Sequence, residues 1–226
     1  DGRIRDGTAS TPGKRVIGVT FNIAARKRRE VEMEQINRQL TAQNALLSQL
    51  NATLALLAAN DSLTGLSNRR TLMEWGVNEC KRARRFGHPL SVMVVDIDLF
   101  KAVNDGWGHL AGDRVICAVA QTCLARTRQG VDTVARYGGE EFVLVLPETD
   151  THDALHLAES LRQAVAARQV LVGDEGVTVC VTVSIGVATL HQGSDLSFED
   201  LVKQADKALY QAKATGRNNV QCCAGG

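Results

Sequence analysis

The sequence contains little proline and no long apolar run. Three of its 226 residues are proline, and none lies between Pro12 and Pro89, so a long helix can form there without an obligatory break. No stretch reaches the roughly 18 consecutive apolar residues that a membrane span requires, and the chain shows no signal-peptide pattern. We therefore expect no membrane span in this chain.

Metal-binding cysteine patterns and an excess of charge of one sign are also missing. The six cysteines (80, 117, 123, 180, 222 and 223) form no Cys-x-x-Cys and no zinc pattern with histidine, which predicts free thiols and a cytoplasmic protein. Lysine and arginine number 26 against 25 acidic residues, so no nucleic-acid partner is expected. With 44% apolar residues, the composition is that of a globular protein.

The first 60 residues predict two segments. Residues 16–23 are rich in β-branched side chains and predict a strand. Apolar residues then recur at steps of three and four, with Gln43 as the polar exception: Met33, Ile36, Leu40, Leu47, Leu50, Leu54 and Leu57. This spacing predicts a coiled-coil helix over residues 25–60 and hence a homodimer. The alternative, a helix lying on its own domain, is disfavoured because glutamines and asparagines fill the remaining positions.

From Asp61 on, helical and strand patterns alternate. Helices are expected at residues 69–86, 110–126, 154–168 and 198–214, and strands at 90–97, 133–136, 142–146, 178–188 and near Val220. The expected fold class is α+β, an α/β sandwich in which helices flank a mixed five-stranded sheet. We assign residues 61–222 to this domain and residues 223–226 to a loose tail.

Two carboxylates close an apolar strand. Asp96 and Asp98 are two residues apart, a spacing that points both side chains to one side of a strand. Oxygen ligands at such a strand end are a common way to bind Mg²⁺. An isolated Asp-x-Asp more often caps the next turn, so the metal interpretation needs a second element.

The second element is a glycine pair followed by two acids. Gly138 and Gly139 lie between two short strands and predict a two-residue hairpin turn, and their missing Cβ atoms let a large ligand approach the backbone. Glu140 and Glu141 follow directly and would repel each other unless a cation lies beside them. A hairpin with a solvated acidic exit is the alternative, which the earlier acid pair makes less favoured.

These residues resemble a known family. Residues 136–142 (RYGGEEF) resemble the signature of GGDEF domains, the diguanylate cyclases, in its Glu-Glu form. Four further motifs are similar to the family's and stand in its order: residues 61–70 (DSLTGLSNRR), 96–105 (DIDLFKAVND), 108–113 (GHLAGD) and 213–218 (KATGRN). The resemblance implies a fold like the palm of nucleotide cyclases and polymerases. It also implies condensation of two GTP into cyclic di-GMP and two pyrophosphates.

The resemblance assigns roles to individual positions. It implies that Asp96, Glu140 and the Ile97 carbonyl bind Mg²⁺ or Mn²⁺, two ions per site. Glu140 would also take the proton of the 3′-hydroxyl, with Glu141 supporting the metals and Lys101 neutralising phosphate charge. The implied substrate contacts are Asn104, His109, Asp113, Gly138, Gly139, Lys213 and Arg217. Within that set, Asn104 and Asp113 would read the guanine edge, and Gly216 would cap a helix carrying Lys213 and Arg217 at its end.

The same resemblance bears on assembly and control. Each protomer would bind one GTP, so two domains must face each other, and a coiled coil would raise their effective concentration to ~mM. Residues 16–23 and the basic helix start after them resemble the end of a PAS sensor domain, to which we assign residues 1–24. Because the chain begins with Asp1 and not Met, we expect it to continue a longer bacterial signalling protein. Its sensor would act through the junction at residues 58–63.

One position departs from the family pattern. Many members carry an Arg-x-x-Asp site for product inhibition that ends six residues before the first signature glycine. Asp132 occupies the last position, but Gln129 replaces the arginine, and Arg128 is one position out and is expected to point elsewhere. Because glutamine lacks the guanidinium fork that clamps phosphates, the sequence predicts weak or absent inhibition by cyclic di-GMP.

Three other functions remain open at this point. A silent GGDEF domain could act as a receptor for GTP or cyclic di-GMP, but Asp96 and the intact signature disfavour it. A structural adaptor would explain the coiled-coil pattern and leave the five motifs without a role. An enzyme making another cyclic product is disfavoured by Asn104 and Asp113, which fit guanine.

Overall fold

A computed structural model describes the backbone of residues 12–173 and 176–223, with the side chains of residues 12–24 and 51–58 left aside. The chain divides into two compact units, residues 1–56 and 57–226, and each is described by itself. Among the described residues, no helix is both long enough and apolar enough to cross a bilayer.

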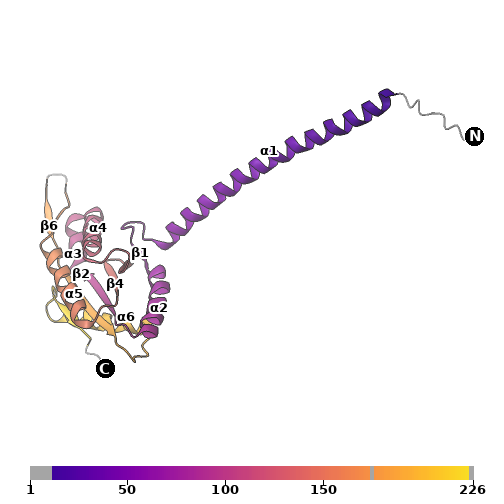
Figure 1. The fold of residues 1–226 in the computed structure, drawn as a ribbon. Helices are drawn as coiled ribbons and strands as arrows, with labels where there is room; N and C mark the ends of the chain where they lie inside the picture. Colours follow the sequence, from indigo (N-terminus) through magenta and orange to yellow (C-terminus); the bar gives the residue numbers. More distant parts are fainter. Residues whose placement is uncertain (1–11, 174–175, 224–226) are drawn as a thin grey trace, which may run out of the picture. The chain divides into compact units, whose positions relative to one another are not determined.

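Helix α1 (Pro12–Ala59) makes up the described part of the first unit (Figure 1). The predicted helix over residues 25–60 lies within α1 except for its last residue, but α1 begins at Pro12, well before the predicted start. The apolar residues of the predicted seam are 44–60% exposed where their side chains are described: Met33, Ile36, Leu40, Leu47 and Leu50. Leu54 and Leu57 lie outside the described side chains. The pairing of this face with a second chain stays a prediction.

The strand predicted at residues 16–23 is wrong, because these residues belong to helix α1. A strand must form hydrogen bonds with a neighbouring strand, whereas a helix satisfies its backbone groups within itself. Pro12 fits the first turn, where its missing N–H would have had no partner. Residues 1–11 of the predicted sensor segment and residues 224–226 of the predicted tail lie outside the described residues.

The second unit alternates helices and strands as predicted. Its elements are β1 (Ser67–Asn68), α2 (Arg69–Phe86), β2 (Leu90–Ile97), α3 (Phe100–Trp107), α4 (His109–Arg126), β3 (Thr133–Gly138), β4 (Glu141–Pro147), α5 (Thr151–Ala166), β5 (Gln169–Leu171), β6 (Thr178–Cys180), β7 (Val183–Leu190), α6 (Phe198–Ala214) and β8 (Val220–Cys222). The predicted bounds of α2, β2 and α6 agree with the structure at both ends.

A mixed sheet forms the centre of this unit, in the order β1-β3-β4-β2-β7-β8. Strand β2 pairs antiparallel with β4 and β7, while β1–β3 and β7–β8 are parallel. Every residue of β2 is buried, because helices cover both faces of the sheet (Figure 1). Residues of α4 and α5 pack on one face, and residues of α2 and α6 on the other. The predicted α/β sandwich is confirmed.

Three details differ from the prediction. The described sheet has six strands and not five, because the two-residue β1 joins its edge. Helix α3 and strand β5 were not among the elements predicted from the sequence. The strand expected at 178–188 divides into β6, which pairs with β5 in a separate two-stranded sheet, and β7 in the main sheet. All six cysteines are free, as predicted.

Candidate active site

The buried carboxylate of Asp96 lies at the end of the central strand. It is 6% exposed and faces Glu141 directly across the β2–β4 pairing, so both side chains project to the same face of the sheet. Helix α6 supplies the counter-charge, with Lys213 Nζ 2.8 Å from Asp96 Oδ2. The structure therefore brings the predicted residues Lys213 and Asp96 together, and the role of Lys213 toward substrate stays a prediction.

Burial raises the pKa of Asp96, and the negative charges of Glu140 and Asp98 add to this effect while Lys213 opposes it. Burial also raises the pKa of Glu141, with further contributions from Asp96 and from Asp206 on helix α6. Burial is thus the main cause of both raised pKa values; the neighbouring carboxylates add to it, and Lys213 opposes it. A set of oxygen donors with excess negative charge has the chemistry that hard divalent cations require.

The glycine turn lies beside these carboxylates and differs by one residue from the prediction. Gly138 pairs with Glu141, so Gly139 and Glu140 are the two turn residues, because the register shifts between Arg136 and Gly138. Gly139 has φ +46°, a conformation that favours glycine. A Cβ atom at Gly138 or Gly139 would meet nothing within 4 Å. The backbone of the turn is therefore open to an approaching ligand.

Asp98 does not form a free acid pair with Asp96. Its carboxylate accepts hydrogen bonds from Thr182 Oγ1 at 2.7 Å, Ser184 Oγ at 2.6 Å and the Asn218 backbone N–H at 3.0 Å. The aspartate thus fastens the segment after helix α6 to the end of β2. The hydrogen bonds described for Asp98 therefore come from distant segments and not from the turn after β2, so the turn-capping alternative is not what the structure shows, while Asp96 faces Glu141.

The segment after α6 confirms the predicted helix cap and corrects the placement of Arg217. Gly216 has φ +110°, and the Arg217 N–H donates to the Ala212 carbonyl at 3.1 Å, which is the hydrogen bond of a Schellman cap. Arg217 itself lies beyond the helix with φ +60°. The direction of the Arg217 side chain is therefore not set by its four-residue spacing from Lys213 along a helix. It is set by the turn after the helix, which Asp98 fixes by accepting from the Asn218 N–H.

A second group of predicted residues lies on helices α3 and α4. Asn104 Oδ1 is buried and has no hydrogen-bond partner among the described residues. A Cβ atom at Gly112 would stand 2.0 Å from that oxygen, so the glycine makes room for the Asn104 side chain. Asp113 is half-buried on α4, whereas Lys101 on α3 and His109 at the start of α4 are exposed. An orphaned acceptor is a place where a bound molecule can supply the missing donor.

An ion pair that the sequence did not predict connects the glycine turn to the start of the domain. Arg136 donates from Nη1 to both carboxylate oxygens of Asp61 at 3.2 Å and from Nε to the Gly139 carbonyl at 2.9 Å. Burial opposes ionisation of Asp61, but hydrogen bonds from Thr64 and Arg136 hold its pKa below the usual value. Asp61 and Arg136 both lie in motifs identified in the sequence, and this was the signal that could have pointed to a structural role for them.

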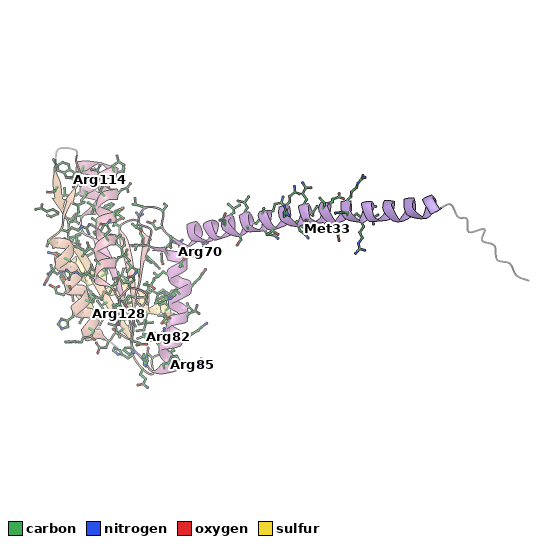
Figure 2. All side chains as sticks on the ribbon, turned by 45° about the horizontal axis from the view of Figure 1, so that its top comes forward. Met33, Arg70, Arg82, Arg85, Arg114 and Arg128 are labelled. Atoms are coloured by element: carbon green, nitrogen blue, oxygen red, sulfur yellow. The ribbon has the colours of Figure 1, made fainter. Side chains whose placement is uncertain are left out.

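The carboxylate of Asp132 forms an ion pair with an arginine of the same chain. The side chain of Asp132 is 1% exposed, and Arg128 donates to it from Nε at 3.1 Å and from Nη2 at 2.6 Å. Arg128 also donates to the Pro147 carbonyl and to Thr149 Oγ1. Figure 2 labels Arg114, which follows Asp113, near the top of the domain and Arg128 in its lower half, and α4, with 18 residues at about 1.5 Å each, separates Arg128 from His109. The Arg128–Asp132 pair is therefore remote from the start of α4.

Comparison with known proteins identifies the family. A model of the family "Diguanylate cyclase, GGDEF domain" matches residues 58–219, and the chain belongs to this family. The crystal structure of the coiled coil and GGDEF domain of DgcB from Caulobacter crescentus in complex with c-di-GMP is 31% identical with a TM-score of 0.74. That match covers 83% of this chain and 98% of that one.

Two curated relatives are similar over the same region. "Response regulator PleD" from Caulobacter vibrioides is 43% identical over 164 residues, which cover 73% of this chain and 36% of the relative. "Diguanylate cyclase DosC" from Escherichia coli K12 is 41% identical over 161 residues, covering 71% of this chain and 34% of the relative. The chain thus spans about a third of the length of these relatives.

Proposed function

We propose that this chain is a diguanylate cyclase, which condenses two GTP molecules into cyclic di-GMP and two pyrophosphates. The observation that carries this function is the set of carboxylates at Asp96, Glu140 and Glu141 beside an open glycine turn. The similarity to proteins named diguanylate cyclase supports the same activity. A cytoplasmic location agrees with free thiols and with a nucleotide substrate.

The residues present fit a divalent metal. Asp96, Glu140 and the Ile97 carbonyl would hold Mg²⁺ or Mn²⁺, two ions per site, with Glu141 in support. The carboxylates of Asp96 and Glu141, which face each other across the β2–β4 pairing, favour this. When bound, such ions would lower the cost of charge on the attacking and leaving oxygens. Glu140 is the proposed acceptor of the 3′-hydroxyl proton, because the turn presents it at the open surface.

The remaining predicted residues would position GTP. Asn104 and Asp113 would read the guanine edge, with the orphaned oxygen of Asn104 accepting from guanine N–H groups. His109 would line the same pocket. Lys101, Lys213 and Arg217 would offset phosphate charge, and Gly138 and Gly139 would let the phosphates approach the backbone. Phosphoryl transfer depends mainly on such positioning and charge compensation.

The reaction requires two copies of the chain, since each site holds one GTP. The exposed apolar face of helix α1 supports a homodimeric coiled coil, and the solved structure of DgcB is described as containing a coiled coil joined to the GGDEF domain. Residues 1–24 would join an upstream sensor, which would regulate the cyclase through the junction at residues 58–63.

Feedback inhibition through Asp132 would be weak or absent. Gln129 lacks the guanidinium of the family's inhibitory site, and Arg128 already neutralises Asp132 from within the chain. A product phosphate would therefore have to displace an internal ion pair, and Asp132 would repel it once freed.

The activity is tested by incubating the purified chain with GTP and Mg²⁺ and separating the nucleotides by chromatography. Cyclic di-GMP and two equivalents of pyrophosphate are expected. Glu140→Gln should lower the rate at least about 100-fold, because it removes a proton acceptor and a metal ligand. Glu199→Gln, which changes an exposed glutamate paired with Lys203, is the matched control and should keep the rate. A Glu140→Gln variant as active as the control would contradict the proposal.

A further inference from the structure

Two histidine rings lie edge to face near the start of helix α5. His152 and His156 are one helical turn apart, with their Nε2 atoms separated by 3.1 Å and their ring centroids by 4.4 Å. Helix α5 follows strand β4, which ends at Pro147 opposite Leu90. Leu90 and Asp96 stand at opposite ends of strand β2, about 20 Å apart at ~3.3 Å per residue. The histidine pair is therefore separate from the candidate active site.

The carboxylate of Asp153 lies beside the other ring nitrogen of His152. Its Nδ1 is 3.4 Å from Asp153 Oδ1, which favours the tautomer with the proton on Nδ1. Nε2 of His152 then carries a lone pair, 3.1 Å from Nε2 of His156. Histidines that bind metals commonly have a carboxylate on the second ring nitrogen, where it fixes the tautomer and makes the ligand more basic.

The distance between the two Nε2 atoms suits a shared ion. In tetrahedral zinc coordination with bonds of 2.0–2.1 Å, two nitrogen ligands lie about 3.3 Å apart. A direct hydrogen bond between the imidazoles would also give a short separation, but it requires a proton on one of the two Nε2 atoms. A metal ion would replace that proton and use both lone pairs.

The local charge also favours a cation. Donor atoms of Asp150, His152 and Asp153 lie within 4.8 Å of one another. The amino end of a helix disfavours positive charge by itself. The Asp150 side chain caps that end by accepting from the Asp153 N–H at 2.9 Å, and the Asp153 carboxylate adds a second negative charge there.

We propose that His152 and His156 bind one Zn²⁺ ion through their Nε2 atoms, with Asp153 as a positioning residue that orients His152. Two imidazoles suit Zn²⁺ and its late transition-metal neighbours, while Mg²⁺ prefers oxygen ligands. Water completes the coordination, because the side chain of His152 is 77% exposed. The site is independent of the proposed cyclase activity.

The test is a calorimetric titration of the full chain with Zn²⁺ in excess Mg²⁺, which keeps the oxygen ligands at Asp96 occupied. A Cys222→Ser, Cys223→Ser background removes the paired thiols as competing ligands. One Zn²⁺ per chain is expected. His152→Gln and His156→Gln should each weaken binding at least about 10-fold, and Asp153→Asn should weaken it by about 10-fold. Circular dichroism of each variant confirms that the fold is kept.

His191→Gln is the matched control, because His191 lies at the same end of the domain but directs its Nε2 toward Thr151 Oγ1 at 3.4 Å. This variant should bind Zn²⁺ like the starting chain. The proposal is overturned if no Zn²⁺ binds, if His156→Gln binds it unchanged, or if His191→Gln loses as much affinity as His156→Gln.

Discussion

Asn104 has a buried amide oxygen that no described protein group satisfies, and Gly112 leaves the space that this side chain occupies. A buried acceptor without a partner costs roughly 1–3 kcal/mol, so a ligand that supplies the donor recovers that free energy. At the scale of a single residue, a glycine on helix α4 thus makes room for the side chain on helix α3 that is proposed to recognise the substrate.

Gly112→Ala should impair GTP binding. Its Cβ atom would stand 2.0 Å from Asn104 Oδ1 and force that side chain away from the pocket. Loss of one such hydrogen bond should raise KM for GTP by about 10-fold, measured from initial rates over a range of GTP concentrations. Gly106→Ala is the control, because a Cβ atom there meets nothing within 4 Å. Equal KM values for the two folded variants would rule out this role of Asn104.

Asp132 gives a second prediction at this scale. Because Arg128 already pairs with Asp132, added cyclic di-GMP should leave the initial rate of the enzyme nearly unchanged. Asp132→Ala should show the same flat response. The measurement is the initial rate at increasing product concentration, together with calorimetric titration of product. Product binding in the nanomolar to low-micromolar range that Asp132→Ala abolishes would show a working inhibitory site.

At the scale of elements, helix α6 and strand β7 approach each other unusually closely at Gly186. A Cβ atom at this position would stand 2.0 Å from the Ala205 carbonyl oxygen and 2.2 Å from the Leu209 nitrogen. Helix α6 carries Lys213 at its end, 2.8 Å from Asp96. The same close packing therefore sets the position of a site residue.

Gly186→Ala should destabilise the domain, because the atoms it meets belong to the helix backbone and cannot rotate away. Overpacking of this kind costs about 1–3 kcal/mol, so Tm should fall by several degrees in a thermal scan. The Lys213–Asp96 contact should also loosen, which predicts lower activity at temperatures below unfolding. Gly106→Ala, in open space on α3, should leave Tm unchanged or raise it slightly. A Gly186→Ala chain as stable as Gly106→Ala would contradict the packing argument.

At the scale of the whole molecule, the proposed cyclase needs two domains in one orientation. Helix α1 ends at Ala59, and Asn60 forms a bridge with Ser67 at the edge of the second unit. Asp61, next to this bridge, forms an ion pair with Arg136, which also donates a hydrogen bond to the Gly139 carbonyl. Within the second unit, residues 60 and 61 are thus connected to the glycine turn by a short series of contacts.

Inserting one, two or three alanines next to Asn60 should change cyclase activity according to helical phase. Each added residue rotates the following domain by about 100° relative to the helix axis, so activity should rise and fall and not decline evenly. The measurement is the rate of cyclic di-GMP formation, with analytical ultracentrifugation to confirm equal dimerisation. A smooth fall in activity with linker length would argue against orientation as the means of control.

The amino-acid sequence by itself determined the order of most helices and strands in the second unit and the positions of its motifs, but not β1, α3 or β5. Periodicity and turn residues are local properties, so the bounds of α2, β2 and α6 could be predicted to the residue. The motifs likewise placed Asp96, Asn104 and Lys213 among the candidate residues. The strand expected at residues 16–23 failed because strand formation depends on a partner that local sequence does not reveal.

The tertiary structure alone decided which side chains meet. Asp96 and Asp98 belong to the same Asp-x-Asp pattern, but their surroundings differ. Asp98 accepts hydrogen bonds from Thr182, Ser184 and Asn218, while Asp96 faces Glu141. Such contacts arise from packing between elements, because the distances that set hydrogen bonds and pKa values are fixed only when the helices lie on the sheet.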